Sequence, residues 1–292
     1  MSLVERAIDK LRRQPGISVP TTVATTVQVP IMPPVDGVPD AGSAARVFID
    51  RDALREAGYL PESNQDRQFA DEYRQIKRPL VASLAEPAGA TGDSRLRAIM
   101  MCSGLPGDGK TFTSINLALS LARERDQSVL LVDADVPKPH VSRIFGIDHE
   151  PGLLDALADA SVDIESLVLP TDVKGLSLLA AGSAQEGATE LLASGRMSAV
   201  VSRLLAANPR RIILFDSSPL LVSTESRALA GSMGQFVLVV RAGSTPRQAV
   251  VDALQLLGEE QPVSIVLNQA RAGLLSDSYG GYYKYGYGDS AE

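Results

Sequence analysis

The feature that most constrains the fold is the segment 104–111, which reads Gly-Leu-Pro-Gly-Asp-Gly-Lys-Thr and fits the pattern G-x-x-x-x-G-K-[ST]. A short apolar run, 98–102, precedes it, and a segment with helical spacing, 110–124, follows it. A glycine-rich turn between a buried strand and a helix lets backbone N–H groups and the positive helix end converge on a phosphate. The segment therefore predicts a phosphate-binding loop and a P-loop NTPase fold.

Apolar runs alternate with helical segments along the chain from residue 97 onward. Strands that alternate with helices indicate an α/β fold with a mostly parallel central sheet and helices on both faces. Since the chain has no Trp and only 4% aromatic residues, its core must be largely aliphatic, as in parallel sheets. The expected strands are 98–102, 129–132, 176–180, 212–215, 236–240 and 263–267, and the expected helices are 110–124, 151–158, 188–207 and 246–257.

The chain divides into four predicted parts. Residues 1–48 combine a short amphipathic helix, 3–13, with a Pro-, Val- and Thr-rich linker that we expect to be disordered. The helix either has no separate task or docks on a membrane surface or partner. Residues 49–96 hold a helical lead-in, 68–84, expected to pack on the core domain, 97–268. After that the periodicity stops, and 269–292 are expected to form a flexible tail.

The loop and the start of the following helix supply the expected nucleotide contacts. Lys110 can reach the β- and γ-phosphates, and the Thr111 hydroxyl can ligate Mg²⁺. The predicted nucleotide-binding residues are Gly104, Pro106, Gly107, Asp108, Gly109, Lys110, Thr111 and Phe112.

Three aspartates follow apolar strands. Asp133 and Asp135 come at the end of the strand 129–132, and Asp216 ends the strand 212–215. In open α/β sheets, ligands bind at the carboxyl ends of the strands. Like charges so close together need a cation or a proton between them. We therefore expect a Mg²⁺ site here, with Asp216 in the position of a Walker B aspartate.

The C-terminal segment, 276–288, carries five of the seven tyrosines of the chain. Such a segment is either a low-complexity tract without chemistry or a set of phosphoryl acceptors beside a nucleotide site. A free tyrosine is almost entirely protonated at pH 7, so transfer to it requires a base, for which Asp133 or Asp135 is available. The candidate acceptors are Tyr279, Tyr282, Tyr283, Tyr285 and Tyr287.

Composition and charge exclude several classes of protein. The formal net charge is −7, which disfavours a nucleic-acid partner. The single cysteine, Cys102, lies in an apolar run and is expected to be a buried hydrophobic residue in a reducing compartment. The N-terminus has no signal-peptide pattern, and no apolar run is long enough to span a bilayer. We therefore expect a cytoplasmic protein that reaches the membrane through a partner.

The three motifs together with the tyrosine tail resemble the bacterial tyrosine kinases (BY-kinases) of polysaccharide synthesis and export, and most closely the autokinases of exosortase-type exopolysaccharide loci. The resemblance covers residues 68–292 and includes 71–79, 189–192, 239–243 and 266–268. It implies a kinase domain at 97–268 that uses ATP and Mg²⁺ to phosphorylate its own tail in trans within a ring-shaped homo-oligomer. It also implies a membrane chain-length-determinant protein (a polysaccharide co-polymerase) as activator and a phosphotyrosine phosphatase as a further partner.

The resemblance also implies roles for individual residues. Lys110 binds phosphate and takes part in catalysis, Asp133 is the expected base, and Thr111, Asp135 and Asp216 are the expected Mg²⁺ ligands, with Asp135 also catalytic. Two positions depart from the family pattern. Pro137 stands where the family often has arginine after the D-x-D motif, and Lys138 follows it. The family oligomerisation motif E-x-x-R-x-x-R reads here Asp71-x-x-Arg74-x-x-Lys77, so the bidentate fork of one arginine is lost.

Two alternatives remain open at this level. A positioning or partitioning ATPase of the same superfamily would commonly carry a second lysine at the position of Leu105, and it would lack the tyrosine tail. A regulatory scaffold that binds ATP without transferring phosphate is the other alternative, because Pro137 alters the pattern after the D-x-D motif. Autophosphorylation separates the kinase from both.

Overall fold

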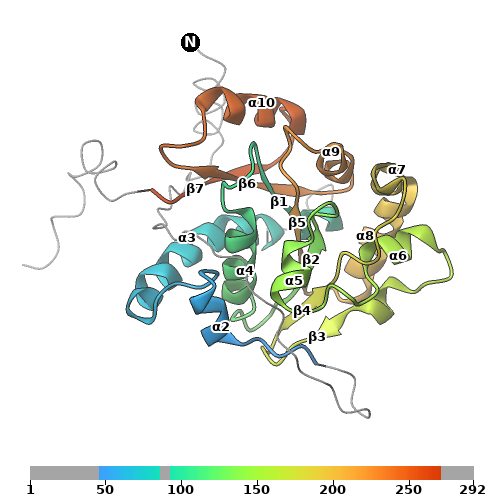
Figure 1. The fold of residues 1–292 in the computed structure, drawn as a ribbon, viewed down its shortest axis with the longest axis horizontal. Coiled ribbons are helices and arrows are strands. Elements are labelled where there is room, and N and C mark those ends of the chain that lie inside the picture. The colour runs from blue at the N-terminus through green and yellow to red at the C-terminus, as the bar shows by residue number, and fades with distance from the viewer. Residues whose placement is uncertain (1–45, 86–92, 271–292) are drawn as a thin grey trace, which may run out of the picture.

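The computed structural model describes residues 46–85 and 93–270, which form an α/β fold around one sheet (Figure 1). Seven strands lie in the order β3-β4-β2-β5-β1-β6-β7. All neighbouring strands are parallel except β3 and β4. This confirms the predicted fold class. The strands are β1 (Ala98–Ser103), β2 (Ser128–Ala134), β3 (Leu169–Pro170), β4 (Leu176–Leu179), β5 (Arg211–Ser217), β6 (Gln235–Arg241) and β7 (Val263–Asn268).

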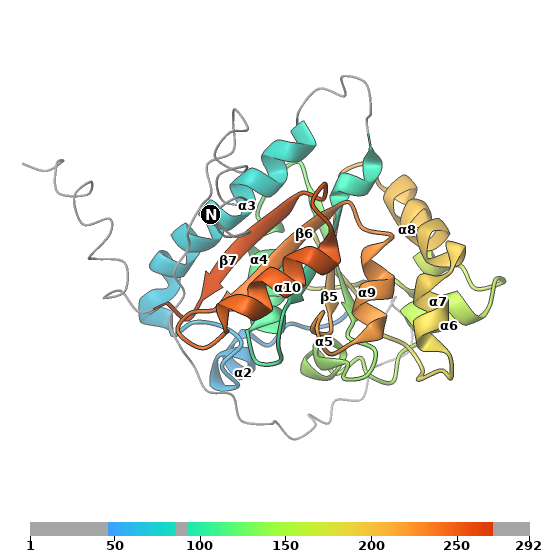
Figure 2. The same cartoon turned by 90° about the horizontal axis from the view of Figure 1, so that it is seen from above.

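Helices cover both faces of the sheet (Figures 1 and 2). One face packs against α2 (Arg51–Glu56), α3 (Asp66–Ala85), α4 (Lys110–Leu121) and α5 (His140–Ile144). The other face packs against α6 (Leu153–Ala158), α7 (Ala188–Ala193), α8 (Gly195–Ala207), α9 (Thr224–Ala230) and α10 (Arg247–Leu257). Three short 3₁₀ turns, η1 (Ser63–Gln65), η2 (Ser94–Arg97) and η3 (Ile164–Leu167), join these elements.

Each central strand divides its side chains between two apolar layers. In β1, Ile99 and Met101 point toward α3 and α4, whereas Met100 and Cys102 point toward the helices of the other face. This follows from the two-residue repeat of a strand. Burial raises the pKa of the Cys102 thiol to about 12, so the thiol stays protonated and acts as a hydrophobic side chain.

The structure differs from the expected elements in several places. The expected helix 188–207 is two helices, because Ser194 between them has an extended backbone with φ −74° and ψ 156°. The short elements α2, α5, α9 and β3 were not among the expected elements. The fold also extends beyond the expected boundaries, because Val47 bridges Thr171 beside β3 and Ala270 is buried.

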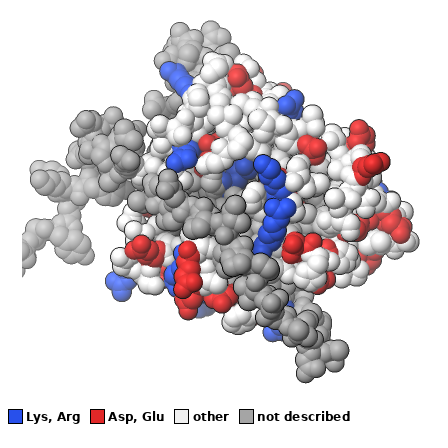
Figure 3. Space-filling model, viewed as in Figure 1, with Lys and Arg blue, Asp and Glu red and all other residues white. Residues whose placement is uncertain are grey.

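The amphipathic helix 3–13, most of the predicted linker and all five candidate acceptor tyrosines lie outside the described residues. Within 46–85 and 93–270, none of the helices combines the length and apolar character needed to cross a bilayer. On the face shown in Figure 3, acidic side chains gather at the edge near α6 and α7. On this face the acidic side chains are therefore unevenly distributed.

Candidate active site

The phosphate-binding loop joins the end of β1 to the start of α4. Gly107 and Gly109 have φ of 83° and 93°, in the left-handed region that favours glycine. Lys110 is the first residue of α4, and only 7% of it is exposed. Its Nζ donates to Ser103 Oγ at 3.2 Å, and that hydroxyl donates to the Leu105 carbonyl at 2.7 Å. The lysine is thus held within the loop by a neutral partner, at the position from which a P-loop lysine reaches phosphate.

Asp108 fastens the loop to the turn after β6 and to the end of β7. Its carboxylate accepts from the Leu105 backbone N–H at 3.2 Å and from Thr245 Oγ at 2.6 Å. Asn268, the last residue of β7, donates through Nδ2 to the Asp108 carbonyl at 2.9 Å. Asp108 was expected to contact nucleotide, and the structure places its side chain in contacts that shape the loop. Sequence reasoning did not find Thr245, and no local pattern marks it.

Two of the predicted aspartates end neighbouring strands side by side. Asp133 on β2 and Asp216 on β5 are paired in register, and both are fully buried. Asp216 accepts hydrogen bonds from the hydroxyls of Thr111 and Ser114, both at 2.7 Å. The structure therefore brings Thr111 to the Walker B position. Ser114 was not predicted, although it lies three residues after Thr111, one turn along α4.

Asp133 and Asp135 differ in their surroundings. Both oxygens of Asp133 accept backbone N–H groups, from Ser142 at 2.7 Å and from Asp135 at 3.2 Å. Asp135 is 7% exposed, accepts from Ser218 Oγ at 2.6 Å and lies 4.0 Å from His140 Nδ1. Asp133 is thus the enclosed carboxylate of the pair, and Asp135 is the one nearer the surface.

Burial decides the protonation of the two enclosed carboxyls. Desolvation, helped by the charge of Asp216, raises the pKa of Asp133 to about 7 against the opposing hydrogen bonds from Ser142 and Asp135. Desolvation also raises the pKa of Asp216, and the charge of Asp135 adds to this, while Lys110 and the two hydroxyls act in the opposite direction. The pair resists carrying two negative charges without a cation.

The donor set fits a magnesium ion held together with a nucleotide. Among the described residues, no group of three or more His, Cys, Asp or Glu side chains is arranged to hold a metal alone. Mg²⁺ usually binds through one or two carboxylates, with phosphate oxygens and water completing its shell. Asp216, Asp135 and the Thr111 hydroxyl would supply the protein ligands. The two enclosed carboxyls with raised pKa values are the observation that favours a cation here.

Two aromatic side chains near the loop have separate roles. Phe112, expected to contact nucleotide, packs edge-on against Phe69 of α3 with ring centroids 6.2 Å apart. Tyr59, in the turn after α2, was not predicted. Burial raises the pKa of its phenol, and the charge of Asp216 raises it further, so the ring lies within electrostatic range of the active site. The lead-in 49–96 therefore contributes side chains beside the nucleotide site.

The oligomerisation motif carried over by resemblance is split by the helix. Lys77 is 9% exposed and turns inward, where Nζ contacts Glu124 at 2.6 Å and the Ser120 carbonyl at 3.0 Å. Arg74 remains exposed and pairs with Asp71 one turn earlier at 2.5 Å. Arg78 is exposed on the same face of α3, which makes it, in place of Lys77, the second outward cation.

Comparisons with known proteins identify the family. A family model described as NUBPL iron-transfer P-loop NTPase matches residues 95–208. The tyrosine-protein kinase YwqD of Bacillus subtilis is 30% identical over 196 residues, which are 66% of this chain and 80% of that protein. The chain belongs to the bacterial tyrosine kinases. The putative tyrosine-protein kinase EpsB of Ralstonia nicotianae is 32% identical over 199 residues, and this kinase spans about a quarter, 25%, of its length.

Solved structures agree with this membership. The VpsO kinase domain has 28% identity and a TM-score of 0.57, over 72% of this kinase and 100% of that domain. The kinase domain of Escherichia coli ETK, at 22% identity and TM-score 0.61, supports the fold alone. So does the MinC:MinD complex of Aquifex aeolicus, at 21% and 0.51. The likeness to a cell-division protein therefore reflects shared architecture, and this kinase is a protein-tyrosine kinase that binds nucleotide.

The two left-handed glycines of the loop give a matched pair of substitutions. A Cβ on Gly109 would lie 2.0 Å from Asn268 Nδ2, whereas a Cβ on Gly107 would meet nothing within 4 Å. We expect Gly107→Ala to cost about 1 kcal/mol of unfolding free energy through backbone strain alone. Gly109→Ala should cost roughly 2–4 kcal/mol, because it also displaces a buried hydrogen bond.

Chemical denaturation of the nucleotide-free proteins measures both costs. Asn268→Ala, introduced into Gly109→Ala, should recover part of the loss because the clashing amide is removed. Equal costs for the two glycine variants would show that Asn268 does not restrain the loop.

Proposed function

We propose that this kinase transfers the γ-phosphoryl group of ATP to the tyrosines between 279 and 287 of a second copy of the chain. The observation that carries the proposal is the hydrogen bond between Asn268 and Asp108. It places the last residue before the tyrosine-bearing tail in direct contact with the phosphate-binding loop. From Ala270 to Tyr279 is nine residues, which span roughly 30 Å when extended. A segment of this length lets the tyrosines extend well away from the chain's own loop, as transfer to a second copy requires.

The side chains divide the work of phosphoryl transfer. Lys110 and the loop N–H groups hold the phosphates, and Gly107 and Gly109 let the backbone approach them. A bound Mg²⁺ would neutralise charge on the transferred group, held by Thr111 and Asp216. The phenol oxygen forms a bond to the γ-phosphorus while the bond to the β-phosphate oxygen breaks. Asp133 holds the phenolic proton, since a pKa near 7 suits a base at neutral pH.

Enclosure of Asp133 does not conflict with this role. Hydrogen bonds of catalytic groups are often long or poorly aligned in unliganded structures and tighten when substrate binds. Asp135, nearer the surface, has an acceptor oxygen facing His140 at 4.0 Å and would join Thr111 and Asp216 as a third Mg²⁺ ligand in this scheme. Lys138 and Pro137, in the turn between β2 and α5, replace the arginine-containing segment of the family pattern.

A mixing experiment tests transfer between copies. Lys110→Met chains, which keep their tyrosines, are incubated with ATP, Mg²⁺ and active chains whose five tail tyrosines are replaced by phenylalanine. Mass spectrometry should find phosphotyrosine on the tail of the Lys110→Met chain, and none when that chain is incubated alone. Transfer within one chain predicts the opposite, because neither partner could then be modified.

We further propose that copies associate through the outward face of α3 formed by Asp71, Arg74, Gln75 and Arg78. This face carries one carboxylate and two guanidinium groups that are exposed for contacts with another copy, and the family resemblance favours a ring. Arg78→Glu should lower the molar mass measured by light scattering without lowering the melting temperature. Lys77→Met should instead cost about 1–2 kcal/mol of stability, because Glu124 loses its partner. An unchanged assembly in Arg78→Glu would rule out this face.

The biological setting follows from relatives and remains a proposal. One relative is described as a putative tyrosine-protein kinase in the cps region of Klebsiella pneumoniae, at 26% identity over 157 residues. The chimerical protein CapA2B2 shares the fold at TM-score 0.63 and 18% identity. We propose that this kinase regulates exopolysaccharide polymerisation or export, with a membrane chain-length-determinant protein as activator. A phosphotyrosine phosphatase would reset the tail.

A further inference from the structure

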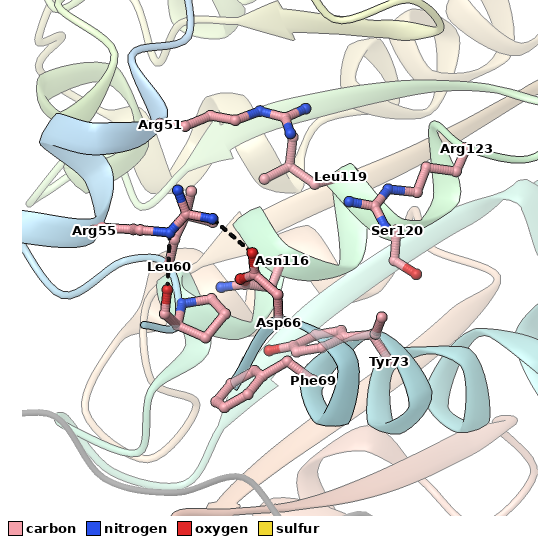
Figure 4. A pocket seen from close by; sticks show the side chains of 12 residues that line it. Arg51, Arg55, Leu60, Asp66, Phe69, Tyr73, Asn116, Leu119, Ser120 and Arg123 are labelled. Atoms are coloured by element: carbon pink, nitrogen blue, oxygen red, sulfur yellow. Dashed lines mark hydrogen bonds and ion pairs between the residues drawn. The ribbon is translucent and has the colours of Figure 1, made fainter. Parts of the chain in front are cut away.

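A hollow of about 140 Å³ lies between α2, α3 and α4, outside the active site (Figure 4). Its apolar lining comes largely from Leu60, Phe69 and Tyr73, whose exposed fractions are 7%, 5% and 3%. Phe69 also packs against Phe112 in the first turn of the phosphate-binding helix. The hollow is therefore a neighbour of the nucleotide site, with a floor suited to a flat ring.

Three guanidinium groups line this hollow, from Arg51, Arg55 and Arg123. Arg55 is already engaged, with Nη2 2.9 Å from Asp66 Oδ2 and Nε donating to the Pro61 carbonyl at 3.1 Å. Arg51 and Arg123 make no ion pair with any residue in the described ranges. The hollow thus joins three cations and a single carboxylate, on a chain whose net charge is −7.

A ligand with an aromatic ring and a doubly charged anionic group matches both the apolar residues and the three arginines that line the hollow. Guanidinium groups form paired, charge-assisted hydrogen bonds with phosphate oxygens, and they do so better than ammonium groups. The apolar floor accommodates a phenyl ring but offers nothing to a free phosphate. Side chains that combine a ring with a phosphate are phosphotyrosines, and phosphorylation adds about −1.5 to −2 charges to each.

We propose that the hollow is a docking site for a phosphotyrosine of the C-terminal segment 279–287. The proposal rests on the function proposed above, since the segment must first be phosphorylated. β7 ends on the same side of the molecule as the first turns of α3 (Figures 1 and 2), and the residues 271–278 that lead to the segment span roughly 26 Å when extended. Docking there removes the reacted tyrosine from the acidic cluster of Asp133, Asp135 and Asp216. The hollow is then a product site that clears the active site.

The test uses the full chain, dephosphorylated and without ATP, and synthetic peptides of residues 276–288 with and without phosphate on Tyr283. Fluorescence anisotropy should show at least about tenfold tighter binding of the phosphopeptide. The double variant Arg51→Ser/Arg123→Ser should lose this preference. The matched double variant Arg125→Ser/Arg210→Ser, which removes two exposed arginines that do not line the hollow, should bind like the parent chain.

Several outcomes would overturn the proposal. These are equal binding of the two peptides, unchanged binding by the Arg51/Arg123 variant, or competition by inorganic phosphate as strong as that by the phosphopeptide. Because the peptides are synthetic, a chain without kinase activity still gives a result, so failure here is distinct from failure of the proposed kinase reaction. A chain with a phosphorylated tail should bind the phosphopeptide more weakly than the dephosphorylated chain, because its own segment competes.

Discussion

Replacing Lys110 with methionine is expected to reduce tail phosphorylation by a factor of about 10²–10³ or more, since one preorganised cation at the transferred phosphate is removed. Methionine has a similar length and suits a position that is only 7% exposed. The single hydrogen bond that it loses is the one to Ser103. The melting temperature of the nucleotide-free protein should therefore change little.

Quantitative mass spectrometry of the tail, with ATP and Mg²⁺, measures this loss. Lys174→Met is the matched control, because Lys174 is exposed in the turn between β3 and β4, and its loss should leave phosphorylation unchanged. Substantial tail phosphorylation by Lys110→Met would contradict the assignment of 104–111 as the catalytic nucleotide site.

Asp133→Asn is expected to slow phosphorylation by about 10²–10⁴-fold if this carboxylate accepts the phenolic proton. The parent protein should lose activity on the acidic limb of its pH profile, because protonated Asp133 cannot act as a base. The variant should lack that limb of the pH profile. Asp126→Asn, an exposed aspartate after α4, is the control and should keep the parental profile. If Asp133→Asn retained full activity, Asp133 would not be the base, and Asp135 would be the remaining candidate.

The same carboxyl makes a second measurable contribution. Its pKa is raised in the folded, nucleotide-free protein, so folding favours the protonated form. This stabilising contribution is complete below the pKa of the unfolded chain and is lost as pH rises toward about 7. Melting temperatures should show the loss between pH 4 and 7, and Asp133→Asn should reduce it. If the parent protein and the variant showed the same pH dependence of the melting temperature, the pKa of Asp133 would not be raised by folding.

Much of the fold was predictable because the strands of a parallel sheet have a distinctive local sequence pattern. Each central strand is buried on both faces, so it reads as a short apolar run. The strand ends carry Asp133 and Asp216, and adjacent strands bring them into register. By contrast, β3 has two residues, and α5 has five, which is too short for a helical period. Ser194 divides a helix whose apolar spacing continues across the break.

The support of the site was not predictable for a different reason. Thr245 and Ser218 reach the loop and Asp135 through contacts that span 137 and 83 residues of sequence. Hydroxyl side chains are common in turns and carry no pattern that assigns them a partner. For Lys77 the sequence pattern was misleading. Its spacing from Arg74 fits a motif whose residues are expected at the surface. The helix nevertheless turns it inward to Glu124.

The hydrogen bond from Asn268 to Asp108 has an energetic consequence for regulation. Asn268 ends the last strand and precedes the tyrosine segment, while Asp108 belongs to the loop that closes around phosphate. Any ligand that displaces one of these residues changes the free energy of the other. Coupling of this kind is reciprocal. If bound nucleotide raises the affinity of a partner for the tail by some factor, the bound partner raises the affinity of the kinase for nucleotide by the same factor.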